Sequence, residues 1–182
     1  LQRKGKREMN DKDSFLLESL QLLAETPVNQ GQIYTFWRMN IDKIDASLIQ
    51  IMSDTTSIML ETHDKEMREF IAAILWRFGD LIQTFPLENR GINLELAITA
   101  YQVCASVFTR EEYPSVWAAL QNKLGNVSRQ RIEDKIEFLH ESLYLSGRSQ
   151  GNPERVYTFW RMNIDKIDAS LIRLMPELAS LI

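Results

Sequence analysis

Hydrophobic side chains recur at intervals of three and four residues along most of the chain. In a helix this spacing places side chains on one face, so the pattern predicts long amphipathic helices rather than strands. The clearest stripe predicts one helix that begins before Tyr34 and continues towards Met59. The members of this stripe are Tyr34, Trp37, Ile41, Ile44, Leu48 and Ile51.

The stripe belongs to a stretch of 16 residues that occurs twice, letter for letter, as residues 34–49 and 157–172. Weaker similarity extends it at a constant offset of 123 residues, beginning at Phe15 and Phe138. Such an internal repeat predicts that one structural unit is used twice. The packing stripe of the second copy consists of Tyr157, Trp160, Ile164, Ile167, Leu171 and Leu174.

Similar stripes predict further helices near residues 13–25, 65–85 and 93–108, and another that starts at Pro114. The expected inner face of this last helix consists of Trp117, Leu120, Leu124 and Val127. Gly125 would let a partner helix press close. Helices joined by short connections pack as antiparallel neighbours. We therefore expect an all-α fold of stacked helical hairpins.

Composition supports this fold and narrows the class of partner. The 182 residues are 45% hydrophobic and include only seven Gly and five Pro, which favours long helices with short connections. The formal charge of −4 is unlike the strongly basic balance of nucleic-acid-binding domains. We therefore expect protein or peptide partners and no nucleic acid.

The single cysteine, Cys104, excludes an intramolecular disulfide. No apolar run approaches the roughly 20 residues that span a bilayer, so we expect a soluble cytoplasmic protein without membrane contact. Because the sequence begins at Leu1 rather than Met, we expect a piece of a longer chain. Its expected parts are a basic tail (residues 1–12), a helical module (13–132) and a truncated second copy of the first hairpin (133–182).

Part of the helical module resembles a known family. The strings 85–87, 93–101, 107–111 and 117–126 resemble the tetratricopeptide (TPR) units at the front of cyanobacterial proteins, many of which carry a carboxy-terminal CHAT protease-like domain. The resemblance implies a TPR-like unit at about residues 92–132, in a helical scaffold that recognises proteins or relays a signal. Lys123 departs from the family pattern, which more often has Asn there. No CHAT domain lies in these residues, so no protease function carries over.

Catalytic chemistry has one weak candidate. Cys104 with His63 or His140 would supply a thiol and a base. Cys104, however, lies on an apolar helical stripe, which favours a core thiol and surface histidines. We therefore expect no enzyme activity.

Metal binding has an equally weak candidate, two pairs of aspartates spaced three residues apart on a predicted helix. Two carboxylates without a further ligand make a poor metal site, so helix-surface ion pairing is the better interpretation. We expect no cofactor and no metal. The two pairs are Asp42 with Asp45 and Asp165 with Asp168.

The expected binding site is the polar face of the helix that begins at Pro114. In TPR proteins the equivalent helix lines a concave surface where polar side chains hold an extended peptide; a merely solvated face is the other interpretation. The residues are Asn122, Asn126, Arg129 and Gln130. The main functional hypothesis is thus a non-enzymatic TPR-like interaction scaffold.

The alternative hypothesis is a homo-oligomeric assembly module of a larger signalling protein whose effector domain, for example CHAT protease-like, lies outside this segment. It rests on the second copy, in which the counterpart of the helix near residues 65–85 does not follow. The stripe containing Tyr157, Trp160, Ile164 and Ile167 must then be covered by the first module or by another chain, as in a homodimer.

Overall fold

A computed structural model describes residues 10–25, 29–86, 90–148 and 153–162. The elements in these ranges are all helical and no strand occurs in them, which confirms the all-α expectation. The elements are α1 (Asp11–Ala24), α2 (Gln30–Met39), the short 3₁₀ helix η1 (Ile41–Lys43), α3 (Ala46–Thr62), α4 (Lys65–Ile82), α5 (Arg90–Val107), α6 (Pro114–Arg148) and α7 (Pro153–Met162).

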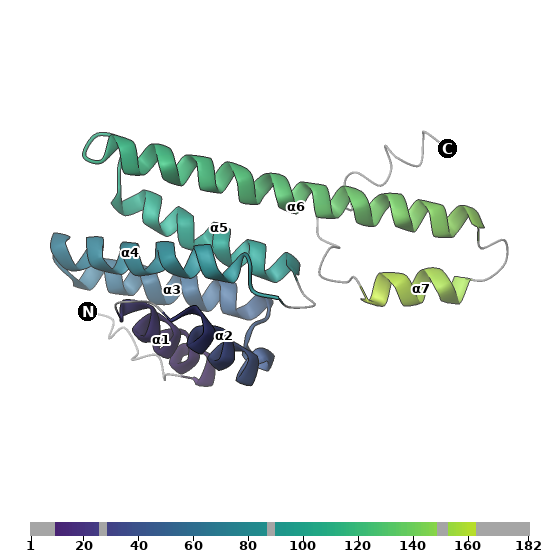
Figure 1. Ribbon diagram of the computed structural model, residues 1–182, viewed down its shortest axis with the longest axis horizontal. Helices are drawn as coiled ribbons and strands as arrows, with labels where there is room; N and C mark the ends of the chain where they lie inside the picture. The colour runs from purple at the N-terminus through teal and green to yellow at the C-terminus, as the bar shows by residue number, and fades with distance from the viewer. Residues whose placement is uncertain (1–9, 26–28, 87–89, 149–152, 163–182) are drawn as a thin grey trace, which may run out of the picture.

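The helices from α3 to α6 run back and forth beside one another (Figure 1). Helix α5 packs on α4, α3 and α6, while α1 packs on α3 and α4 and carries α2 against it. In Figure 1, α1 and α2 form one edge of this body and α6 forms the other. The far part of α6 extends beyond the body, and α7 packs along that extension.

The predicted continuous helix from Tyr34 to Met59 is wrong, because the chain leaves the helical path between α2 and α3. The Asn40 side chain donates to the carbonyl of Phe36 (2.9 Å), and its backbone N–H bonds the carbonyl of Trp37 (3.1 Å). Five residues later, Asp45 is the N-cap of α3. Asn and Asp side chains that bond nearby backbone groups compete with helix continuation.

The break changes which stripe residues are buried. Ile41 lies in η1 with 48% of its surface exposed, so it does not belong to the core. Ile44 and Leu48 return to the interior after the break, and Trp37 is completely buried before it. Residues before and after the break therefore belong to the same core, although the helix between them is interrupted.

Trp37 joins three helices. Its ring packs edge-on against Phe78 of α4 (centroids 5.4 Å apart) and against Phe85 just beyond α4 (5.3 Å). Its indole N–H donates to the hydroxyl of Ser19 in α1 (3.0 Å), and that hydroxyl donates to the carbonyl of Phe15 (2.8 Å). A buried indole N–H therefore has its partner, as burial of a polar group requires.

The second copy begins inside α6, which crosses residues 132 and 133 without a break. In the first copy, Asn10 caps α1 and forms a reciprocal capping box with Asp13. The corresponding residues of the second copy are Glu133 and Ile136. Because the residues that start a helix in the first copy are replaced, the preceding helix continues into the repeat.

Helix α7 has the bounds of α2 shifted by 123 residues, and it packs on α6 as α2 packs on α1. The rings of Phe138 and Phe159 stack at 5.3 Å, as those of Phe15 and Phe36 do at 5.5 Å. The described part of the second copy thus repeats the packing of the first two helices of the chain. Of the expected packing residues, Tyr157 and Trp160 belong to α7, whereas Ile164 and Ile167 lie outside the described residues.

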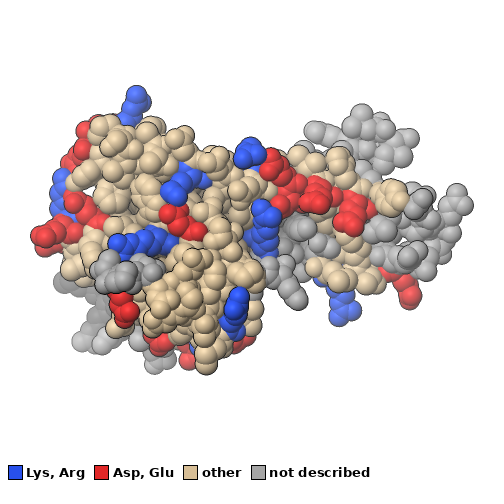
Figure 2. Space-filling model, viewed as in Figure 1, with Lys and Arg blue, Asp and Glu red and all other residues tan. Residues whose placement is uncertain are grey.

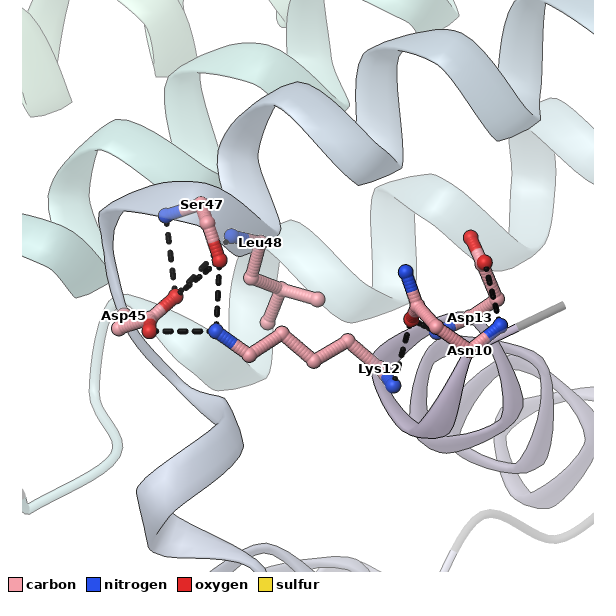
Figure 3. Close-up of polar contacts among 6 residues, drawn as sticks. All are labelled: Asn10, Lys12, Asp13, Asp45, Ser47 and Leu48. Atoms are coloured by element: carbon pink, nitrogen blue, oxygen red, sulfur yellow. Dashed lines mark hydrogen bonds and ion pairs between the residues drawn. The ribbon is translucent and has the colours of Figure 1, made fainter. Parts of the chain in front are cut away.

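A polar contact fixes the start of α3 against α1 (Figure 3). The Lys12 ammonium binds the Asp45 carboxylate (2.5 Å) and donates to the Ser47 hydroxyl (2.6 Å). The same carboxylate accepts from the backbone N–H groups of Ser47 (2.9 Å) and Leu48 (3.3 Å). Partial burial opposes ionisation, but the hydrogen bonds from Lys12 and Ser47 outweigh it and lower the pKa of Asp45.

We expect Trp37→Ala to lower the free energy of unfolding by about 3–5 kcal/mol, because it leaves a large cavity and removes the hydrogen bond that the Ser19 hydroxyl accepts. Urea unfolding followed by circular dichroism measures this difference. A loss below about 1 kcal/mol would contradict the central position of Trp37 in the core.

We expect Asp45→Asn to lower the free energy of unfolding by up to about 1 kcal/mol at neutral pH, since it removes a partly exposed ion pair but keeps a capping side chain. The lowered pKa of Asp45 means that its ionised contacts stabilise the fold above about pH 4 and are lost as pH falls further. The difference from wild type should therefore shrink in acid. Urea titrations over a pH series test this, with Asp42→Asn, an exposed aspartate of η1, as control. A difference independent of pH would contradict it.

Candidate functional site

The four residues expected to bind a partner lie on α6, on the side turned away from α5. Leu120 and Val127 are the buried positions of this part of the helix. The carboxamides of the site make no hydrogen bond with the described residues, and Arg129 pairs with Glu133 (2.8 Å). Asn122, Asn126 and Arg129 are exposed and Gln130 is half-buried. The structure therefore places these residues together on an outward-facing side.

A partly buried polar network holds α6 to the rest of the body. The Asp80 carboxylate of α4 accepts from the Tyr101 hydroxyl of α5 (2.5 Å) and binds the Lys123 ammonium of α6 (2.6 Å). The indole N–H of Trp76 donates to its other oxygen (3.1 Å), and Gln83 donates to the Tyr101 hydroxyl (3.1 Å). One carboxylate thus connects three helices.

The same network explains Lys123, which departs from the TPR pattern. Its ammonium lies 5.7 Å from the centre of the Trp76 ring and 5.8 Å from that of Tyr101, within the range of cation–π attraction. An Asn at this position could not supply the charge that Asp80 binds. Burial, followed by the hydrogen bond to Asp80, raises the pKa of Tyr101, so its hydroxyl stays a proton donor.

Gly79 is required where α4 meets α5. A Cβ atom at this position would lie 2.6 Å from Cε1 of the Tyr101 ring, closer than carbon atoms approach. Gly125 on α6 differs, because nothing lies within 4 Å of a Cβ placed there. The expectation that Gly125 admits a neighbouring helix of the same module is therefore wrong, since its side of α6 is exposed.

Cys104 is a core residue. It is completely buried, and its thiol donates to the carbonyl of Ala72 (3.0 Å). Burial raises the pKa of the Cys104 thiol to about 12, so a thiolate nucleophile does not form there at neutral pH. His63 and His140 are both exposed, and no hydrogen bond joins either to Cys104 in the described part of the chain.

The aspartate pair of the first copy has a structural role at one of its members. Asp45 caps α3 and binds Lys12, whereas Asp42 is exposed in η1. Within the described ranges no three His, Cys, Asp or Glu side chains group in a way that could hold a metal ion. Asp165 and Asp168 lie outside the described residues.

A hollow of about 430 Å³ lies where the end of α3, the start of α4 and the end of α5 meet. Leu60 and Val107 supply apolar walls, and the charged lining includes Lys65, which pairs with Glu112 (2.7 Å). Arg68 also lines it and forms no ion pair with any described residue. The sequence carried no sign of this hollow, because it forms only where the junction of α3 and α4 meets the end of α5, which is far away along the chain.

Charges of both signs are interspersed over the face shown in Figure 2, and acidic side chains gather over the part of α6 that extends towards α7. None of the described helices combines the length and the apolar character that crossing a membrane requires. Comparisons of the chain with models of protein families, with curated proteins and with solved structures find no match. The site is therefore interpreted from its own geometry.

The two mid-helix glycines form a matched pair for a stability measurement. We expect Gly79→Ala to destabilise the fold by about 1–3 kcal/mol, because the new methyl group overpacks the Tyr101 ring. Gly125→Ala should instead stabilise it by about 0.5–1 kcal/mol through helix propensity alone. Urea unfolding at low protein concentration measures both changes. If both variants have a higher free energy of unfolding than wild type, helix propensity outweighs packing against Tyr101 at Gly79, which would contradict the prediction.

Proposed function

We propose that the chain is a non-enzymatic, TPR-like helical scaffold that binds a protein or peptide partner along the outward side of α6. The observation that carries the proposal is the pair of exposed carboxamides, Asn122 and Asn126, which make no hydrogen bond with the described residues. Consecutive helices that pack on one another, with α3 also reaching α5, are consistent with a helical-hairpin repeat.

The spacing of the two carboxamides suits an extended peptide. Residues four apart in a helix rise by about 6 Å along its axis. Alternate residues of an extended chain repeat at about 6.6–6.8 Å. Because the two spacings are similar, Asn122 can bond the backbone of one peptide residue and Asn126 that of the next residue but one. A carboxamide both donates and accepts, which matches the N–H and C=O groups of a peptide backbone.

Arg129 lies one turn further along and supplies a positive charge to the same side. Its pair with Glu133 is exposed at both ends, and exposed pairs of this kind are worth less than about 1 kcal/mol. The guanidinium can therefore exchange Glu133 for an acidic side chain or the terminal carboxylate of the peptide, which it can bind with two hydrogen bonds. We expect a peptide that presents backbone to the asparagines and a carboxylate to Arg129.

The scaffold holds this side in place before the partner arrives. Leu120 and Val127 bury the inner side of α6, and Lys123 ties it to Asp80. Residues on a fixed helix lose little freedom when they bind, which favours affinity. The role of the remaining helices in this proposal is to position α6.

Selection of peptides from a random display library on the immobilised protein tests the proposal. The affinity of a selected peptide should fall at least about tenfold in the double variant Asn122→Ala, Asn126→Ala, since two hydrogen bonds of about 1 kcal/mol each are lost. Fluorescence anisotropy with a labelled peptide measures the dissociation constant.

Arg68→Ala is the matched control, because it changes an exposed polar side chain at the hollow and leaves α6 intact. Its peptide affinity should equal that of wild type. If no peptide is selected, or if Arg68→Ala weakens binding and the asparagine variant does not, the binding surface is not the outward side of α6.

A further inference from the structure

Helix α6 exposes an apolar side next to the peptide side described above. Ile132 is 57% exposed and Ile136 is 45% exposed, although isoleucine is normally an interior residue. Gly125 precedes them by seven and eleven residues, a spacing that places all three on one side of a helix. This group of Gly125, Ile132 and Ile136 is called the ridge-and-notch face, with the isoleucines as ridge and the glycine as notch.

No described residue explains the glycine. Gly in a helix interior costs about 1 kcal/mol relative to Ala. At Gly79 the Tyr101 ring accounts for this cost, but nothing lies within 4 Å of a Cβ placed at Gly125. A glycine that lets another backbone or a large side chain come close is the usual reason to keep one in such a place.

Ile136 occupies a position that is polar in the first copy. Its counterpart is Asp13, which belongs to the capping box at the start of α1. Because α6 is continuous, position 136 has no capping role, yet it carries an exposed isoleucine rather than another polar residue. The same position of the repeat thus carries a capping aspartate in the first copy and an exposed isoleucine in the second.

We propose that the ridge-and-notch face is the contact of an antiparallel homodimer, in which α6 packs against α6 of a second copy. A two-fold axis midway between residues 130 and 131 places Ile136 of each copy opposite Gly125 of the other, so ridge meets notch twice. The two Ile132 side chains then flank the axis. A two-fold contact needs one self-complementary surface, and a large group and a small group equally distant from the axis provide it.

Charge complementarity is compatible with this register. Arg129 lies about one and a half residues before the proposed axis and Glu133 about two and a half residues after it. In the antiparallel pair Arg129 of one copy therefore lies within one residue of Glu133 of the other along the helix, close enough for these long side chains to pair, and the reverse pair forms by symmetry. In each monomer Arg129 pairs with Glu133 of the same helix (2.8 Å). In the dimer these two pairs are replaced by two pairs between the helices. A parallel arrangement would instead place like charges opposite each other, which is unfavourable.

The contact is small. The residues from 125 to 136 span about 17 Å of helix, and an interface of this length falls below the roughly 1,200 Å² of stable complexes. We therefore expect a weak dimer that depends on concentration. Arg129 is shared with the proposed peptide side, but the ridge-and-notch face itself contains none of Asn122, Asn126 and Gln130, so the dimer proposal does not require that a peptide binds. It also differs from a dimer through the second copy, since the contact is on α6.

Sedimentation velocity over a concentration series tests the dimer. The double variant Ile132→Glu, Ile136→Glu should raise the dissociation constant at least about tenfold, because it places four acidic groups in the contact. Gly125→Ile should do the same by filling the notch, and the open space around Gly125 lets the monomer accept it. Ile58→Glu, at a residue of α3 that is 54% exposed, is the matched control and should leave association unchanged.

Charge reversal tests the register. Arg129→Glu alone should weaken association, and the double variant Arg129→Glu, Glu133→Arg should restore it. Circular dichroism confirms that each variant is folded. A wild-type protein that stays monomeric at every concentration would overturn the proposal. So would a dimer that tolerates Gly125→Ile and the glutamate variant, because its contact would then lie elsewhere. The isoleucine and glycine variants leave Asn122, Asn126 and Arg129 in place, so a failure of the dimer proposal is distinguishable from a failure of the peptide selection.

Discussion

The burial of Trp37 between α1, α2 and α4 is the contact on which the rest of the fold depends. The ring packs on Phe78 and Phe85, and its N–H donates to the Ser19 hydroxyl. These contacts fix the positions of α1, α2 and α4 relative to one another. Tyr34 adds to the cluster by packing on Phe85 (5.0 Å) and donating to the carbonyl of Leu81 (3.0 Å). Once α4 is fixed in this way, its other side presents Gly79 and Asp80 to α5 and α6. The position of α6, and with it every surface proposed to bind, follows from that arrangement.

The sequence predicted the all-α class and the repeat because both depend on local spacing. Helix boundaries were harder to predict. A hydrophobic stripe with a spacing of three and four residues does not show where a polar side chain bonds the backbone and ends the helix. Asn40 and Asp45 end one helix and start another by bonding nearby backbone groups, yet Ile44 and Leu48 continue the pattern through the break. The opposite error occurred in α6. There the repeat suggested a new helix, but the capping residues of the first copy were missing and the helix continued.

The candidate site was predicted in part for the same reason. Asn122 and Asn126 are four residues apart, so their shared side of α6 could be read from the sequence. Whether that side faced a groove could not, because it depends on which residues α5 covers. The roles of Asp80 and Lys123, which are 43 residues apart, depend on the packing of three helices. No local pattern distinguishes such a lysine from a solvated one.

The duplication shows how one sequence acquires different surfaces in different surroundings. In the first copy the hairpin starts with a capped helix and docks on α4, so its polar start and apolar stripe both have structural roles. In the second copy the first helix of the hairpin is the continuation of α6, so the residue at position 136 does not cap a helix. A residue released from a structural role can change without loss of the fold. Position 136 carries an isoleucine that is 45% exposed, and eleven residues earlier stands a glycine with nothing described within 4 Å of a Cβ placed there. In the monomer, alanine at position 125 would stabilise the helix more than glycine does. The exposed isoleucine and the mid-helix glycine lie on the same side of α6. A contact between this side and the same side of a second copy explains both features at once.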